Sequence, residues 1–162
     1  MSKIYESLIN SFQHEIKHYN NNLYKPCVVF DIDGTILVDG VYSPRDESEI
    51  ISNIYDFLMY IQDRGIDIFI ITARPDNIHN RHGTKQMLDK LNIKYTYLYM
   101  WNLDVFNNHV SYKESARKEI FDNNYNIIMS LGDNYWDYGD YGGLGVHIYD
   151  NGRKIKYINE FL

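Results

Sequence analysis

The stretch Cys27–Val38, CVVFDIDGTILV, decides the fold. Its first four residues are apolar or small and indicate a short buried strand, which runs directly into Asp31, Asp33 and Gly34. Because side chains two residues apart on a strand point the same way, we expect the two carboxylates to share one face where the strand ends. Ligands bind at that carboxyl end in open parallel α/β sheets. Two carboxylates there repel each other unless a cation or a proton lies between them, so the stretch predicts a polar binding site.

The composition is typical of one soluble globular domain over residues 1–162, with 44% hydrophobic and 23% charged residues. The net charge of −6 argues against a dedicated nucleic-acid binder, which usually carries a basic stripe. Cys27 is the single cysteine, so no disulfide forms within the chain. The N-terminus lacks the apolar core of a signal peptide, and no apolar run is long enough to span a membrane. These features predict a cytoplasmic protein without membrane contact, and they leave its oligomeric state open.

Apolar runs alternate with helical patterns along the chain. Strands are expected at 27–31, 67–72, 95–100, 126–131 and 145–149, followed by a short C-terminal tail. Helices are expected at 3–19, 44–64, 78–91 and 111–122, the third and fourth after the second and third strands. This alternation predicts an α/β fold, a Rossmann-like three-layer sandwich with a five-stranded parallel sheet.

The segment after the first strand predicts a small flap. Asp39 and Gly40 lie between two apolar triplets, which is a strong signal for a two-residue β-hairpin. Such a hairpin would hang over the carboxylates at the strand end. The intervals from Thr35 to the next helix and from Thr72 to Lys113 hold only the expected elements, so we expect no cap domain.

Residues His14–His18 match the HExxH pattern of zinc proteases. The helical periodicity places both histidines away from the apolar stripe, on the solvated side, whereas a catalytic zinc helix faces a closed cleft and needs a third ligand. We therefore interpret the match as a polar helix face.

Four polar clusters fall at the ends of successive apolar runs or on the helix that enters one. They are Asp31/Asp33, Thr72, Lys113 and Asp133/Asp137. Right-handed crossovers bring the carboxyl ends of parallel strands to one edge of the sheet, so these clusters should converge.

This order resembles the four motifs of the haloacid-dehalogenase (HAD) superfamily: DxDGT, a strand-final Thr or Ser, a Lys, and GDxxxD. The resemblance covers about residues 26–149. Within the superfamily, residues 72–75 (TARP), 112–113 (YK) and 131–133 (LGD) resemble the acid-phosphatase-like branch, subfamily III. Asp33 two residues after Asp31 favours phosphate-ester hydrolysis over dehalogenation, as the resemblance implies.

The resemblance implies catalytic roles for four of these residues. Asp31 is suited to attack phosphorus and form an aspartyl-phosphate, and an ordinary aspartate, with a pKa of about 3.9, is already ionised at pH 7. Asp33 would protonate the leaving alkoxide and later deprotonate water. Thr72 would donate to a phosphoryl oxygen, and Lys113 would neutralise charge and orient Asp31.

Mg²⁺ is the expected cofactor, because it prefers oxygen ligands. The implied ligands are the carboxylates of Asp31 and Asp133 and the backbone carbonyl of Asp33. Asp137 would act through water or as a further ligand.

Several neighbouring residues admit two interpretations. Arg74, Arg81 and His82 follow the second motif, either as solvated charges at a helix start or as substrate contacts. The aromatic cluster Tyr135–Tyr141 could pack against the protein or stack on a nucleobase.

The sequence therefore predicts a Mg²⁺-dependent phosphomonoesterase acting on a phosphorylated substrate, small or large. A polynucleotide 3′-phosphatase is an alternative that the acidic net charge does not favour. A non-catalytic module that binds phosphate or phosphoprotein is another.

Overall fold

The computed structural model describes residues 2–20 and 22–159. It contains one six-stranded sheet with the order β3-β2-β1-β4-β5-β6. The strands are β1 (Lys25–Phe30), β2 (Asp67–Pro75), β3 (Tyr97–Trp101), β4 (Tyr125–Gly132), β5 (Leu144–Tyr149) and β6 (Lys154–Ile158). All neighbours pair in parallel except β5 and β6, which are antiparallel. The single domain predicted for residues 1–162 includes residues 1, 21 and 160–162, which lie outside the described ranges.

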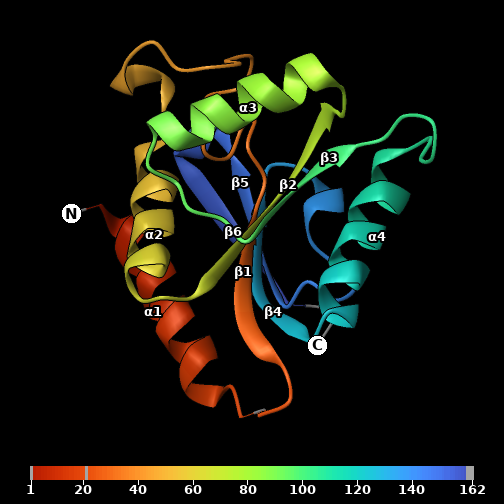
Figure 1. Ribbon diagram of the computed structural model, residues 1–162. Helices are drawn as coiled ribbons and strands as arrows, with labels where there is room; N and C mark the ends of the chain where they lie inside the picture. The colour runs from red at the N-terminus through yellow and green to blue at the C-terminus, as the bar shows by residue number, and fades with distance from the viewer. Residues whose placement is uncertain (1, 21, 160–162) are drawn as a thin grey trace.

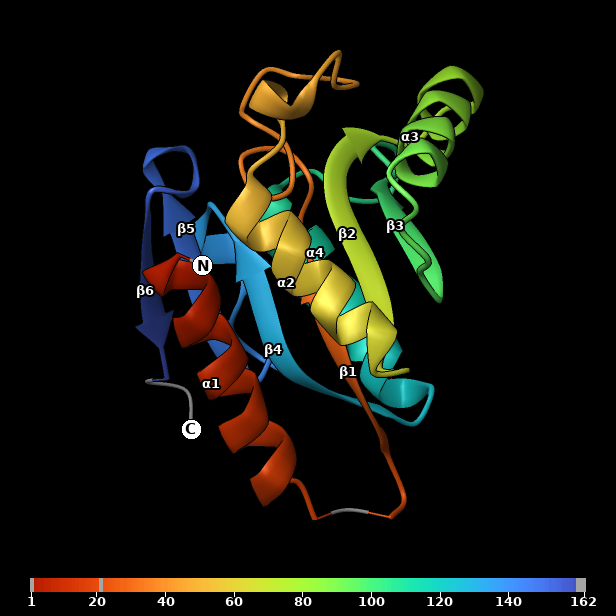
Figure 2. The same cartoon turned by 90° about the vertical axis from the view of Figure 1, so that its left-hand side faces the viewer.

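Helices cover both faces of the sheet. They are α1 (Lys3–His18), α2 (Ser52–Asp63), α3 (Ile78–Lys90) and α4 (His109–Asp122). Figure 1 shows the sheet nearly edge-on, with α1 and α2 on one side and α4 on the other. In Figure 2 α1 and α2 lie in front of the sheet and α4 lies behind it. The buried apolar residues of α3, Met87 and Leu88, belong to the same hydrophobic cluster as those of α1 and α2. The expected α/β architecture with helices on both faces is confirmed.

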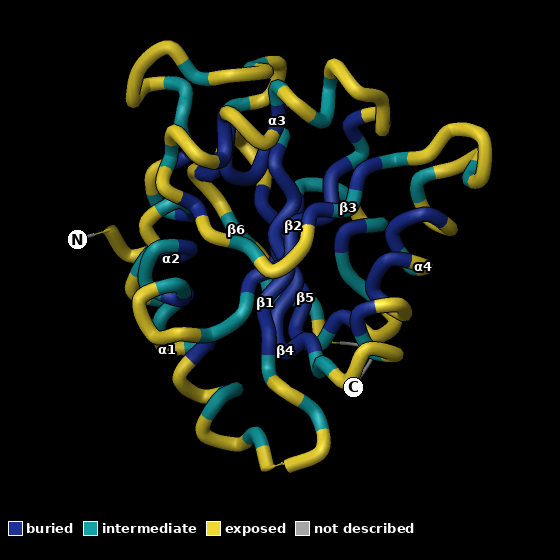
Figure 3. The backbone as a smooth tube through the Cα atoms, viewed as in Figure 1, coloured by how far each residue is buried: buried dark blue, intermediate teal, exposed yellow. Residues whose placement is uncertain are grey.

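Alternation along β1 explains why the core has two halves. Val28 and Phe30 belong to the hydrophobic cluster under α1, α2 and α3, whereas Cys27 and Val29 belong to the cluster under α4. β1 is therefore apolar on both faces, as expected for a central parallel strand. Figure 3 shows this buried centre, with exposed residues on the outer surfaces of the helices.

Two helices begin elsewhere than predicted. α2 starts at Ser52, because the chain from 44 to 51 forms only a short 3-10 turn, η1 (Glu47–Glu49), before extending again. α4 starts at His109, because the Asn108 side chain accepts a hydrogen bond from the backbone N–H of Ser111 and caps the helix.

The hairpin predicted around Asp39 and Gly40 does not form a two-stranded ladder. A turn is present, but Leu37 pairs with Ile50 in an isolated antiparallel bridge. The backbone N–H of Val38 donates to the carbonyl of Glu49 at 3.0 Å. Because these backbone groups are already paired with the segment before α2, they are not available for the other arm of a hairpin. The absence of a cap domain stays a prediction.

The sixth strand was expected to be a tail. It follows β5 through the short 3-10 turn η3 (Asp150–Gly152), in which Asn151 and Gly152 have positive φ.

Within the described residues, no helix has both the length and the apolar character needed to cross a bilayer.

Candidate active site

The predicted clusters converge at the carboxyl ends of three neighbouring strands. β1 lies between β2 and β4, so the chain crosses to opposite sides of β1, and ligands typically bind at such a switch point. Asp31 directly follows β1, Thr72 lies in β2, and Asp133 directly follows β4. The N–H of Asp31 donates to the carbonyl of Leu131 at 3.0 Å, which extends the β1–β4 pairing into the site.

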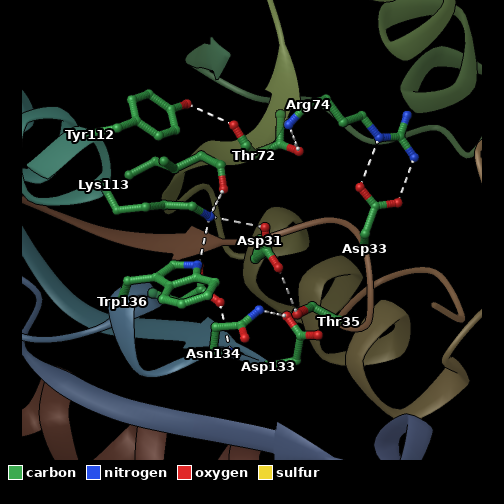
Figure 4. A network of polar contacts seen from close by, with 12 residues as sticks. Asp31, Asp33, Thr35, Thr72, Arg74, Tyr112, Lys113, Asp133, Asn134 and Trp136 are labelled. Atoms are coloured by element: carbon green, nitrogen blue, oxygen red, sulfur yellow. Dashed lines mark hydrogen bonds and ion pairs between the residues drawn. The ribbon is translucent and has the colours of Figure 1, made fainter. Parts of the chain in front are cut away.

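Lys113 joins two of the carboxylates. Its ammonium nitrogen lies 3.0 Å from Oδ1 of Asp31 (Figure 4). The same nitrogen lies 2.6 Å from Oδ1 of Asp137. The ammonium also donates a hydrogen bond of 2.7 Å to the carbonyl of Ile71 in β2. Lys113 is 1% exposed, so α4 buries a cation directly against the strand ends.

Asp31, Asp133 and Asp137 form a compact acidic group. One carboxylate oxygen from each lies within 4.8 Å of the others. Burial raises the pKa of Asp31 well above its usual value, with further increases from Asp137 and Asp133 that Lys113 only partly opposes. Burial also raises the pKa of Asp133. The expectation of an ordinary carboxyl pKa for Asp31 therefore does not hold in the protein without a bound cation, where that pKa is raised.

The donor set fits a hard divalent cation. The ammonium of Lys113 contacts two of the three carboxylates, so the ionised group and Lys113 together carry a net charge of −2. Carboxylate oxygens are the ligands that Mg²⁺ prefers. The close approach of the acids to the backbone requires glycine at two positions. A Cβ on Gly34, which has φ +76°, would overlap the carboxylate of Asp133, and a Cβ on Gly132 would overlap that of Asp137.

Asp33 does not share a face with Asp31. Its two oxygens accept hydrogen bonds of 3.0 and 2.9 Å from Nε and Nη2 of Arg74, away from the acidic group (Figure 4). β1 ends at Phe30, and the chain then turns, so the two-residue alternation of a strand no longer applies. The prediction that the two carboxylates point the same way is wrong.

Arg74 is buried rather than solvated. Its side chain is 6% exposed, and besides Asp33 it donates to Oγ1 of Thr84 and to the carbonyl of Tyr42. The guanidinium carbon lies 4.5 Å from the centroid of the Tyr42 ring. Arg74 therefore connects the first motif to α3 and to the loop before α2. β2 continues to Pro75, beyond the predicted end of the strand at residue 72, and this extension places Arg74 within the strand.

Thr72 is fully buried. Its hydroxyl oxygen accepts a hydrogen bond of 3.2 Å from the backbone N–H of Arg74, which leaves the hydroxyl hydrogen free to donate. Its carbonyl accepts a hydrogen bond of 2.7 Å from the Tyr112 hydroxyl, so α4 also holds this end of β2.

Arg81 and His82 lie on α3. Arg81 forms an ion pair of 2.9 Å with Asp76, and His82 is exposed. Neither contacts the acidic group.

Most of the aromatic cluster packs against the protein. Trp136 stacks on His109 with centroids 4.6 Å apart, and Tyr141 packs on Phe121. Tyr135 is 65% exposed and contacts Trp136 at its edge.

The HExxH match is confirmed as a polar helix face. His14 and His18 are exposed on α1, and their rings lie 4.2 Å apart. Within the described parts of the chain, the acidic group is the one set of three or more His, Cys, Asp or Glu side chains close enough to share a metal ion.

Residues 42–159, well over half of the chain, match the model of the family described as HAD superfamily, subfamily IIIB (acid phosphatase). No curated protein sequence matches the chain.

Two similar solved structures are described as the Pnkp1/Rnl/Hen1 complex and the Pnkp1/Rnl/Hen1 RNA repair complex. The first aligns with a TM-score of 0.57 and 19% identity over 72% of this chain. The second aligns with a TM-score of 0.58 and 20% identity over 73% of this chain. The aligned part spans only 41% and 39% of those longer chains, so the similarity is one of fold.

Proposed function

The chain belongs to subfamily IIIB of the HAD superfamily, the acid phosphatases, and on this basis we propose that it hydrolyses phosphate monoesters with Mg²⁺ and with Asp31 as the nucleophile. Membership makes it a phosphoric monoester hydrolase whose substrate is phosphorylated, and it confirms the resemblance drawn from the motifs. The observation that carries the proposal is the acidic group of Asp31, Asp133 and Asp137 around Lys113. When the three acids are ionised, they and Lys113 have a net charge of −2, which one divalent cation neutralises.

The carboxylates of Asp31, Asp133 and Asp137 would hold the ion, together with the backbone carbonyl of Asp33 that the resemblance implies. When bound, Mg²⁺ would supply positive charge for the phosphoryl oxygens and would favour the ionised form of Asp31.

Asp31 then performs the first displacement. Lys113 holds Oδ1, whereas the hydrogen bond that Oδ2 accepts from Thr35 is long, at 3.4 Å, so Oδ2 is the freer oxygen for attack. A bond forms between Oδ2 and phosphorus as the bond from phosphorus to the ester oxygen breaks. Thr72 donates its free hydroxyl hydrogen to a phosphoryl oxygen.

Asp33 completes the proton transfers. It is the more accessible acid, with a side chain 37% exposed. It donates a proton to the departing alkoxide and then takes one from the water that attacks the aspartyl-phosphate, which releases inorganic phosphate and restores Asp31. Arg74 holds both of its oxygens in the structure, so Asp33 must exchange this partner before it carries a proton.

Hydrolysis of p-nitrophenyl phosphate tests the proposal. We expect turnover that requires Mg²⁺, stops with a chelator, and is abolished by Asp31→Asn. Asp104→Asn, which changes an exposed acid on the loop after β3, is the matched control and should leave kcat/KM unchanged. Phosphate binding without turnover, or full activity in Asp31→Asn, would refute the nucleophilic role and favour a binding module.

Hydrolysis of a 3′-phosphate on a polynucleotide is the second candidate. It is supported by the fold similarity to chains of an RNA repair complex, and the net charge of −6 counts against it. Comparison of kcat/KM for 3′-phosphorylated oligonucleotides and for mononucleotides separates the two. A large preference for the oligonucleotide that weakens steeply with salt would favour this candidate.

A further inference from the structure

α4 buries a second cation one turn beyond Lys113. Arg117 is 3% exposed, and its Nε and Nη1 donate hydrogen bonds of 2.9 Å to the backbone carbonyls of Asp140 and Trp136. Among the described residues, no carboxylate forms an ion pair with it. Its partners are therefore the main chain of the segment that carries Asp137.

A buried guanidinium of this kind is poorly explained by stability alone. Taking a charge out of water is costly, and well-packed apolar residues often stabilise a protein as much as a buried ionic group does. The planar fork of the guanidinium instead provides a fixed geometry, because its donors hold the carbonyls of Trp136 and Asp140 in place relative to α4. The segment has glycines, Gly139 and Gly142, where the Arg117 side chain packs against it. A Cβ on Gly142 would lie 3.2 Å from Cδ of Arg117, and one on Gly139 would lie 3.6 Å from its Nη2.

The held carbonyls lie next to the acidic group. Trp136 immediately precedes Asp137, which is 4% exposed and bonded to Lys113. The other end of the segment is fastened separately, by a hydrogen bond of 2.8 Å from Ser130 to the carbonyl of Gly142. Lys113 and Arg117 thus reach the same segment from one helix, the first through a side chain and the second through the backbone.

We propose that Arg117 is a positioning residue that sets the place of Asp137, and thereby the affinity of the acidic group for its divalent cation, by holding the carbonyls of Trp136 and Asp140. This role rests on the proposed function. Partners that orient metal ligands typically change metal affinity by about 10–100-fold when they are removed.

Mn²⁺ binding to the full chain without substrate, measured by calorimetry, tests the role directly. We expect the Kd to rise about 10–100-fold in both Arg117→Lys and Arg117→Gln, since neither side chain reproduces the fork. Lys118→Gln removes the next cation on α4, which is exposed, and should leave the Kd unchanged. In activity assays the Mg²⁺ concentration for half-maximal rate should rise in the two Arg117 variants, while KM for p-nitrophenyl phosphate at saturating Mg²⁺ changes by less than about threefold.

A folded Arg117→Lys that binds Mn²⁺ with the wild-type Kd overturns the role, because charge alone would then suffice. If the wild-type protein binds no Mn²⁺, that result contradicts the proposed function itself, and therefore also the role of Arg117 that rests on it. If the Arg117 variants fold poorly, the measurement is repeated in sucrose, which favours the compact state. If they still do not fold, Ser130→Ala decides: it loosens the other end of the segment, and a raised Kd supports the role whereas a wild-type Kd overturns it.

Discussion

Removing the Lys113 ammonium should destabilise the protein strongly when no metal is bound. Lys113→Met keeps the length of the side chain and deletes the charge that Asp31 and Asp137 share. The side chains of all three residues are at most 9% exposed. Breaking a buried ion pair by removing one partner costs about 3–5 kcal/mol. For a chain of this length, roughly 2–4 °C per kcal/mol gives a fall in Tm of about 6–20 °C.

The assay is thermal unfolding in the presence of a chelator, followed by circular dichroism. Lys118→Met is the matched control on the same helix, because Lys118 forms an exposed ion pair with Asp122 that contributes little. Added Mg²⁺ should recover part of the loss in Lys113→Met, since a cation again balances the acids. Equal Tm values for the two variants in chelator would refute the electrostatic account of the site.

The loss in Lys113→Met should also grow with pH. Lys113 lowers the pKa of Asp31, so its removal raises further a pKa that burial already holds high. The folded variant then retains a proton that the unfolded chain releases near pH 4. Stability falls with rising pH wherever the folded state binds more protons, so the Tm deficit should be larger at pH 8 than at pH 5. A deficit that is the same at both values contradicts this cause.

Three further changes test other parts of the site. Gly132→Ala should lower kcat/KM for p-nitrophenyl phosphate by at least about 10-fold, because the new Cβ displaces Asp137, and unchanged kinetics would count against a role for that acid. Arg74→Lys should lower kcat by up to about 10²-fold with little change in KM, because it loses the two-point hold on Asp33, and a change confined to KM would contradict this. Cys27 should not react with a thiol reagent until the chain is unfolded, since burial raises the pKa of its thiol, and rapid labelling of the native protein would disprove that burial.

The convergence of the acids was predictable from sequence because it depends on topology alone. Asp31 and Asp133 directly follow apolar runs, and Lys113 lies near the start of the helix that precedes β4. In a parallel sheet these places meet at one edge, whatever the details of packing. The burial of Arg74 and Arg117 could not be predicted in this way, because their partners are backbone carbonyls and an acid on loops whose paths depend on the whole fold.

Turn signals were less reliable than strand ends, and two similar dipeptides show why. Asp39-Gly40 has the residues of a hairpin turn, yet Leu37 pairs with a different segment. Asn151-Gly152 carries the same kind of signal and does lie between two paired strands, β5 and β6. Both dipeptides can form a tight turn. Whether a ladder grows from it depends on which backbone groups are still free, and that is decided by residues distant in the sequence.

The separation of Asp31 from Asp33 arises because β1 ends before them, and it has a chemical consequence. Alternation holds only while the backbone stays extended, and here it stops at Phe30. One acid therefore stays on the α4 side of the sheet, against Lys113, while the other turns toward Arg74. If both carboxylates shared one face, each would raise the pKa of the other and they would compete for one cation. The turn after the strand instead places the two acids against different cations, Lys113 and Arg74. In the proposed mechanism this lets Asp31 stay a buried nucleophile while Asp33, nearer to solvent, exchanges protons.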